Sequence, residues 1–191
     1  MAKKDSTFTN MLITLLVVTF VSATALGYVY ELTKEPIEQA KQKKNIEAIQ
    51  QVVPKFDNNL NEAKHQLQTE EGETLDAYDA KIGDSIVGVA IKTYSNKGFS
   101  GEVWLMVGFT PEGSIYNISV LDHKETPGLG TKMNDAIFKD QFNNKNPGTF
   151  KLKVKKDGGD VDAITAATVS SRAFCDAVER AHKAFMKGGN Q

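Results

Sequence analysis

The longest apolar stretch lies near the beginning of the sequence. It reads MLITLLVVTFVSATALGYVY over residues 11–30, twenty positions without a charged side chain. A helix needs about twenty such residues to cross the ~30 Å hydrocarbon layer of a bilayer. The pattern therefore predicts a single transmembrane helix, with residues 1–31 forming the N-terminal segment and the span.

The residues around this stretch give the predicted span a direction. Lys3 and Lys4 precede it, and Glu31 and Glu35 are among the charged residues that follow it. Because basic residues favour the cytoplasmic side, the pattern predicts a cytoplasmic N-terminus and a translocated body. The alternative is a cleaved signal peptide, since ATA at 23–25 has the small-x-small form of a cleavage site. The apolar stretch continues beyond that site, which favours a retained anchor.

A polar region separates the span from the rest of the chain. From Thr33 to Pro54 apolar positions recur at roughly helical spacing, which predicts one helix. Thr33 is a suitable cap for it, Pro36 suits its first turn and Pro54 ends it. Residues 57–84 are mostly polar and predict a connector with only short structure. Residues 32–84 are therefore expected to form a membrane-proximal helix and a connector.

The pattern changes at Ser85, where β-branched and aromatic residues become frequent. Three strands of an antiparallel meander are predicted, at SIVGVAIKTYS (85–95), GEVWLMVGFT (101–110) and IYNISVLDH (115–123). A helix is then expected over 131–142, and FKLKVKK (150–156) alternates as a half-buried strand should.

The last predicted element is a helix that begins near Thr168. Phe174, Val178, Ala181 and Phe185 recur at spacings of four, three and four, which places them on one face. Residues 85–191 are thus expected to form an α+β domain in which helices pack on an antiparallel sheet.

Composition excludes several classes of protein. The 23 basic and 24 acidic residues leave no basic field for nucleic acid. Cys175 is the only cysteine, so neither an internal disulfide nor a cysteine-based metal cage can form. His65, His123 and His182 lack metal-ligand spacing, and the GxSxG motif of many hydrolases is absent. No metal site and no hydrolase are expected.

Hydroxyl groups are concentrated where the last helix begins, in VDAITAATVSSRAF (161–174). One interpretation is capping, in which Thr165 or Thr168 accepts a hydrogen bond from a free backbone N–H and Asp162 favours the same end of the dipole. The other is a phosphate site made of backbone amides and hydroxyls. Arg172 lies four residues after Thr168 and could then reach the anion. Both interpretations fit the residue types.

The order of these residues resembles a known motif. DAITAATVSS is similar to the flavinylation motif of FMN-binding domains, whose last threonine carries FMN through a phosphoester bond. By position the acceptor is Thr168, with Asp162 and Thr165 as parts of the signature. Ala166 stands where the family usually has glycine. HKETPGLG (123–130) resembles the ETPGLG loop of the same family.

The resemblance also implies the surroundings of the flavin. Glu125, Thr126, Leu129 and Gly130 would border the ring, and Trp104 is a further candidate that sheet packing explains equally well. The redox chemistry would belong to FMN, so no catalytic side chain is expected.

The motifs and the single span point to the G subunit of the Rnf ion-translocating electron-transport complex. Such a chain would be a non-autonomous electron-transfer subunit, linked to ferredoxin and NAD, in the cytoplasmic membrane with its flavin domain on the extracytoplasmic side. Its partners would be other membrane subunits, a flavin transferase and membrane lipid. The alternatives are the related C subunit of sodium-translocating NADH:quinone reductase, a tethered structural domain that never receives flavin, and a flavoprotein released by signal cleavage.

Overall fold

A computed structural model describes residues 7–60, 62–69 and 71–188. The chain divides into two compact units, Met1–Lys43 and Lys44–Gln191, whereas the sequence predicted boundaries after residues 31 and 84. Lys3 and Lys4, on which the predicted orientation depends, lie outside the described residues.

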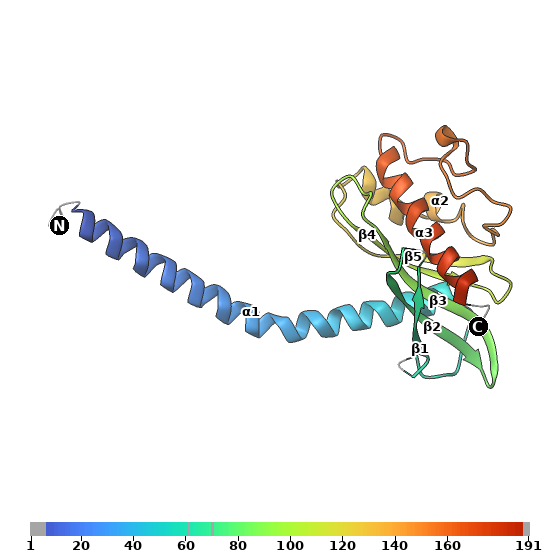
Figure 1. Cartoon of the computed structure of the whole chain (residues 1–191), viewed down its shortest axis with the longest axis horizontal. Helices are drawn as coiled ribbons and strands as arrows, with labels where there is room; N and C mark the ends of the chain where they lie inside the picture. Colours follow the sequence, from blue (N-terminus) through green and yellow to red (C-terminus); the bar gives the residue numbers. More distant parts are fainter. Residues whose placement is uncertain (1–6, 61, 70, 189–191) are drawn as a thin grey trace. The chain divides into compact units, whose positions relative to one another are not determined.

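The first element is the helix α1, Phe8–Val52 (Figure 1). Its apolar stretch has a mean hydropathy of 2.1 and no buried part, so by length and composition it can cross a membrane. The predicted second helix start is wrong: the Thr33 hydroxyl donates to the Val29 carbonyl at 2.8 Å instead of capping, and Pro36 lies inside the helix. An interior proline removes one helical N–H and crowds the carbonyl four residues earlier, which can bend a helix without ending it. The helix ends before Pro54, as predicted.

Five antiparallel strands form one sheet in the order β1-β2-β3-β4-β5. Their bounds are Lys64–Gln68, Thr74–Ile82, Ser85–Ser95, Val103–Phe109 and Ile115–His123. The predicted meander of β3, β4 and β5 is confirmed. The connector expected over 57–84 is wrong, because β1 and β2 lie within it. β1 is largely exposed and only Leu75, Ala77 and Ala80 of β2 are buried, so the polar composition reflects half-exposed strands.

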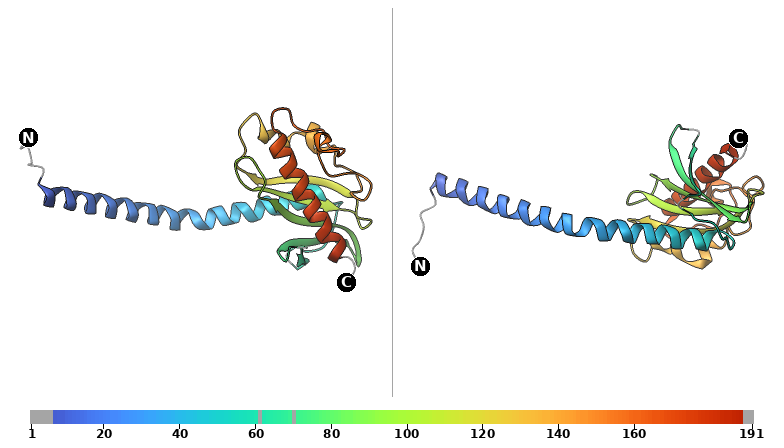
Figure 2. Two further views of the ribbon diagram at one scale, coloured as in Figure 1. Left: turned by 45° about the horizontal axis from the view of Figure 1, so that its top comes forward. Right: turned by 90° about the horizontal axis from the view of Figure 1, so that it is seen from below.

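The two faces of the sheet are covered by different helical segments (Figure 2). The helix α3, Thr168–Gly188, packs Phe174, Val178 and Ala181 on one face. Residues 44–52 of α1 cover the other face and bury Ile49 and Val52. The α+β fold and the apolar face predicted for α3 are therefore confirmed.

The helix predicted over 131–142 is shorter than expected. It consists of a 3-10 turn, η1 (Gly130–Asn134), followed by a single helical turn, α2 (Ala136–Lys139). Phe138 and Phe142 are buried and meet Phe174 with ring centroids 5.1 and 5.0 Å away. The apolar spacing therefore correctly predicted which side chains are buried, Phe138 and Phe142, although the segment that carries them is irregular.

The strand predicted over 150–156 is wrong. Val154 forms only an isolated bridge with Val161, and a 3-10 turn, η2 (Lys155–Asp157), follows. Leu152 and Val154 are nevertheless buried between exposed lysines. Alternation reports which side chains face the core, and it does not require a pairing partner.

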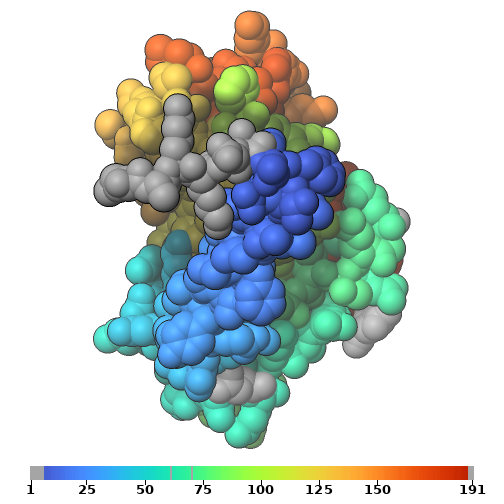
Figure 3. Space-filling view, turned by 90° about the vertical axis from the view of Figure 1, so that its left-hand side faces the viewer, coloured from blue at the N-terminus to red at the C-terminus, as the bar shows by residue number. Residues whose placement is uncertain are grey.

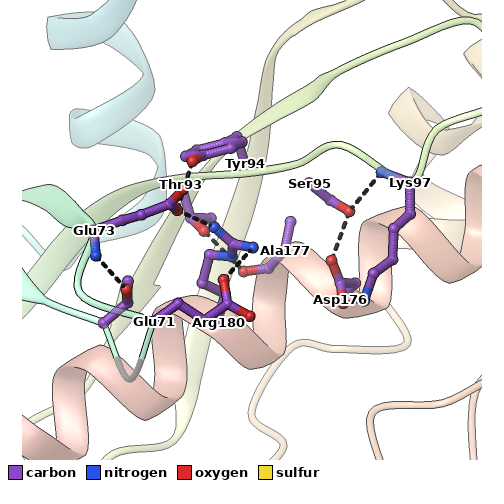
Figure 4. A network of polar contacts seen from close by, with 10 residues as sticks. Glu71, Glu73, Thr93, Tyr94, Ser95, Lys97, Asp176, Ala177 and Arg180 are labelled. Atoms are coloured by element: carbon purple, nitrogen blue, oxygen red, sulfur yellow. Dashed lines mark hydrogen bonds and ion pairs between the residues drawn. The ribbon is translucent and has the colours of Figure 1, made fainter.

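Polar contacts fix α3 against the sheet and the β1–β2 turn (Figure 4). The buried Thr93 hydroxyl donates to the Ala177 carbonyl at 3.0 Å, and the Ser95 hydroxyl donates to the Asp176 carboxylate at 2.6 Å. Arg180 forms ion pairs with Glu71 and Glu73 in the turn. Ser95 is the last residue of β3, so these contacts also fix the start of the loop at 96–102.

Gly108 in β4 provides a test of the packing of residues 44–52. A Cβ atom at this position would lie 1.6 Å from the Val52 carbonyl oxygen. Gly108→Ala is therefore expected to lower the free energy of unfolding by about 1–3 kcal/mol through overpacking. The measurement is thermal unfolding of the detergent-solubilised chain. Gly88→Ala is the matched control, because its nearest contacts lie at 3.1 Å. Equal stability of the Gly108 variant and wild type would contradict the close approach.

Candidate functional site

Three segments meet at one end of the second unit and enclose a pocket. They are the loop at 96–102, the segment at 125–130 and the residues leading into α3, which gather in Figure 3 as lime, yellow and orange surfaces. The pocket has a volume of about 310 Å³, at the lower end of the range for small-molecule sites. It is lined by Phe99, Glu125, Thr126, Leu129, Gly130, Ala166, Ala167, Thr168, Val169 and Ser170.

Thr168 is the first residue of α3 and lines the pocket while half-buried. Within the described part of the chain its hydroxyl has no hydrogen-bond partner, and neither has that of Thr165. The caps expected from these two threonines are therefore not seen. Instead the Ser171 hydroxyl accepts from the Ile164 N–H at 2.9 Å and donates to the Ala167 carbonyl at 3.0 Å. A helix N-terminus with a free hydroxyl favours an anion.

Ala166 shapes the turn that leads into α3. Its φ of +61° lies in the left-handed region, where an L-residue other than glycine is strained. The neighbouring Ala167 N–H closes the turn on the Ile164 carbonyl at 3.0 Å. The position at which this sequence departs from the family motif is therefore one where the backbone favours glycine.

Glu125 is a buried carboxyl group at the base of the pocket, with 5% exposure. The Ser170 hydroxyl donates to its Oε2 at 2.7 Å, and the Ser100 N–H donates to its Oε1 at 3.3 Å. A Cβ atom on Gly130 would lie 2.6 Å from Oε2 and 2.7 Å from Ser170 Oγ. Glycine at this position therefore leaves the space that the buried carboxyl group needs.

The mouth of the pocket is apolar. Phe99 is 72% exposed, and Leu129 and Val169 are each 41% exposed. Gly128 has a φ of +76° and donates its N–H to the Thr131 hydroxyl at 2.9 Å, so the loop turns sharply before Leu129. Exposed apolar side chains around a pocket are typical of a ligand or partner site.

Asp162 and Thr165 do not line the pocket, although the motif includes both. Asp162 is exposed and its carboxylate accepts from Lys155 Nζ at 2.7 Å. Its backbone is held by Gln141, which accepts from the Asp162 N–H at 2.7 Å and donates to its carbonyl at 3.2 Å. Thr165 is exposed. The side chains of these two residues therefore face solvent outside the pocket.

Arg172 and Trp104 also lie away from the pocket lining. Arg172 donates Nε and one terminal nitrogen to the two carboxylate oxygens of Asp157, each at 2.7 Å. These hydrogen bonds hold the pKa of Asp157 below its ordinary value. The Trp104 ring stacks on Tyr94 with centroids 4.7 Å apart, and its N–H donates to Glu102 at 2.9 Å. Sheet packing thus accounts for Trp104.

The sequence missed five lining residues: Phe99, Ala166, Ala167, Val169 and Ser170. Four of them lie inside the motif segment at 161–174, so their closeness to Thr168 follows from the sequence. The contact of Ser170 with the buried Glu125 does not. Phe99 is an aromatic residue in a polar loop, and only the fold brings it to Leu129 and Val169.

Other reactive groups lie outside this site. Burial raises the pKa of the Cys175 thiol to about 12, which suits a core residue and disfavours the thiolate. Within residues 7–60, 62–69 and 71–188, no three His, Cys, Asp or Glu side chains are grouped so that they could hold a metal ion.

Comparison with known families defines the class of this domain. The family model described as FMN-binding domain matches residues 98–183, a range that includes every residue lining the pocket. The pocket therefore belongs to an FMN-binding domain.

Curated relatives identify the family. The chain is 34% identical over 173 residues to the G subunit of the ion-translocating oxidoreductase complex of Vibrio cholerae, covering 84% of this chain and 82% of the relative. It is 32% identical to the protein of the same name from Shewanella amazonensis, covering 82% and 78%. The chain belongs to this family of Rnf-type G subunits, which confirms the prediction made from the two motifs.

The fold is also seen in a solved structure from another complex. The C subunit of Na⁺-translocating NADH-quinone reductase from Parabacteroides distasonis superposes with a TM-score of 0.53 at 20% identity, covering 72% of each chain. This likeness shows a shared fold. The higher identity to the G subunits favours the main prediction over the alternative from the quinone reductase.

The residues present fit an FMN molecule. A flat ring needs apolar surface, which Phe99, Leu129 and Val169 offer at the mouth. A phosphate group needs N–H donors and positive potential, which the first turn of α3 supplies next to the free Thr168 hydroxyl.

The strain at Ala166 leads to a stability prediction. Ala166→Gly is expected to raise the free energy of unfolding by about 0.5–1 kcal/mol, because the left-handed strain of about 1–2 kcal/mol is partly offset by the greater freedom of glycine in the unfolded chain. Thermal unfolding measures the change. Asn144→Gly is the control, since Asn144 has nearly the same φ of +59° but asparagine tolerates it. Destabilisation by Ala166→Gly would contradict the strain.

The Arg172–Asp157 pair leads to a prediction on pH. Because the pKa of Asp157 is lowered in the folded chain, the pair stabilises the fold above the ordinary value of 3.8, and this contribution is lost as pH falls through the lowered pKa. Arg172→Ala is expected to raise the pKa of Asp157 towards 3.8, measured by carboxyl NMR titration, and to leave flavin loading unchanged by intact mass. A loss of loading would place Arg172 in the flavin site.

Proposed function

We propose that this chain is the electron-relaying subunit of an ion-translocating oxidoreductase complex and carries FMN covalently on Thr168. The observation that supports it most is the free hydroxyl of Thr168, which lines a pocket at the N-terminus of α3. The names of the curated relatives supply the type of complex, and the matched family supplies the cofactor.

The attachment needs a phosphoryl transfer to Thr168. A new bond joins Thr168 Oγ1 to the phosphorus of the flavin nucleotide, and the hydroxyl proton leaves. A flavin dinucleotide is a suitable donor, since its pyrophosphate bond breaks and the second nucleotide departs with the electron pair. A separate flavin transferase would catalyse this step. The exposed Asp162 and Thr165 are the parts of the motif that it can reach on the folded domain.

The residues of the chain hold and shield the cofactor. The first turn of α3 offers N–H groups to the phosphate, and Phe99 and Leu129 offer apolar surface to the ring. Thr126 and Glu125 contribute polar groups to the same lining. When bound, FMN accepts and donates electrons, and this redox chemistry is its own. The chain is therefore a relay whose electron donor and acceptor are other subunits.

The chain is membrane-anchored, as its apolar helix and its membership of this family indicate. Our proposal adds a single pass with a cytoplasmic N-terminus and the flavin domain on the extracytoplasmic side, in contact with lipid and with other membrane subunits. A retained anchor is preferred over a cleaved signal because α1 continues without interruption through residues 23–25. The link to ferredoxin and NAD rests on the resemblance to the Rnf complex.

Substitution of Thr168 tests the attachment. Thr168→Val keeps the shape of the side chain and removes the hydroxyl, so flavin loading is expected to fall to background. Thr168→Ser keeps the hydroxyl and is expected to retain loading. Each chain is made with an active flavin transferase, and loading is measured by intact mass and by in-gel fluorescence after denaturation.

The two variants also separate the competing interpretations. Flavin on Thr168→Val would place the attachment elsewhere. An unmodified wild-type chain, with the transferase active on another substrate, would favour the tethered structural domain.

A further inference from the structure

The three walls of the pocket share one internal contact point, the carboxyl group of Glu125. Ser100 belongs to the loop at 96–102, Glu125 begins the segment at 125–130, and Ser170 lies in the first turn of α3. These same three segments line the pocket. Within the described part of the chain, Glu125 is therefore the polar group that connects all three.

The carboxyl group is enclosed closely. A Cβ atom on Gly98 would lie 2.7 Å from Oε1, and one on Gly130 would lie 2.6 Å from Oε2. Glu125 and Ser170 are 5% and 2% exposed. The backbone on both sides therefore approaches the carboxyl group as closely as glycine allows, which leaves little room for either loop to shift.

The carboxyl group has a hydrogen-bond donor beside each oxygen. Oε1 accepts from the Ser100 N–H and Oε2 accepts from the Ser170 hydroxyl, and an ionised carboxylate can accept on both oxygens. In the part of the chain that the structure describes, no lysine, arginine or histidine forms an ion pair with Glu125. A buried negative charge without a cation acts strongly on its neighbours, because little water screens it.

We infer that Glu125 is a positioning residue for the flavin site: its carboxylate connects the three walls through hydrogen bonds, and its negative charge, which no cationic side chain of the described residues pairs, lowers the electron affinity of the bound cofactor. The inference rests on the proposed function, since it assumes that flavin occupies this pocket. A negative charge in the lining disfavours the addition of electrons to any group held beside it. The chain would thereby keep its flavin a strong electron donor.

Substitutions at Glu125 separate the effect of its hydrogen bonds to Ser100 and Ser170 from the effect of its charge. Glu125→Gln keeps the shape and a hydrogen-bonding group for Ser170, but removes the charge. Glu125→Ala removes both. Ser170→Ala removes one hydrogen bond and is a milder test of these contacts if the alanine at 125 prevents folding. Glu102→Gln is the control, because Glu102 is an exposed carboxylate whose charge water screens.

The first measurement is hydrogen-exchange mass spectrometry on the full chain without flavin. Glu125→Ala is expected to speed amide exchange at least tenfold in 98–102 and 125–131, and Ser170→Ala by a smaller factor. Exchange in the middle of α3 should stay unchanged, and Glu125→Gln should resemble wild type. If both alanine variants exchange within twofold of wild type in both loops, the hydrogen bonds of Glu125 do not hold these loops and this part of the inference is wrong.

The second measurement is a redox titration of the chain loaded with flavin, with loading verified by mass. Glu125→Gln is expected to raise the midpoint potential by at least about 30 mV, which for a two-electron couple corresponds to a tenfold change in the equilibrium constant for reduction. Glu102→Gln should leave it unchanged. An unchanged potential in Glu125→Gln would overturn the role of the charge. A wild-type chain that takes up no flavin would instead refute the proposed function. The exchange data, which need no flavin, would still show whether the hydrogen bonds of Glu125 hold the loops.

Discussion

The packing of α3 on the sheet is the constraint on which the site depends. Phe174, Val178 and Ala181 bury the inner face of the helix, and the Thr93 and Ser95 hydroxyls fix it along the axis. A helix held in this way has a fixed N-terminus, so Thr168 and the other residues of its first turn keep their place in the lining of one pocket. Asp162 and Thr165 precede this helix and remain exposed, whereas Val161 and Ile164 beside them are buried in the core.

The opposite face of the sheet is covered by the last residues of α1. Residues 44–52 bury Ile49 and Val52 against this face, and Gly108 lets the helix end lie directly on β4. The pocket and the α1 contact therefore occupy separate parts of the domain.

Sequence reasoning succeeded where the physical signal is local. The long apolar helix, the meander of β3, β4 and β5, and α3 were found because hydrophobic periodicity and turn residues are local signals. It failed for β1 and β2, whose exposed faces resemble a connector, and for residues 150–156, whose buried valine and leucine lack a strand partner. Within the site, Thr168, Glu125 and Leu129 were found through two short motifs, whereas Phe99 and Ser170 depend on contacts between distant segments.

The sequence by itself determined the long apolar helix, the meander, the final helix and the motif segment that contains Thr168, because each is encoded by neighbouring residues. The tertiary structure alone decided which hydroxyls point inward, that Arg172 pairs with Asp157, and that Glu125 is buried between Ser100 and Ser170. These facts depend on segments far apart in the chain that meet only after the sheet and α3 have packed. No local pattern carries that information, since each contact needs a partner whose position the fold creates.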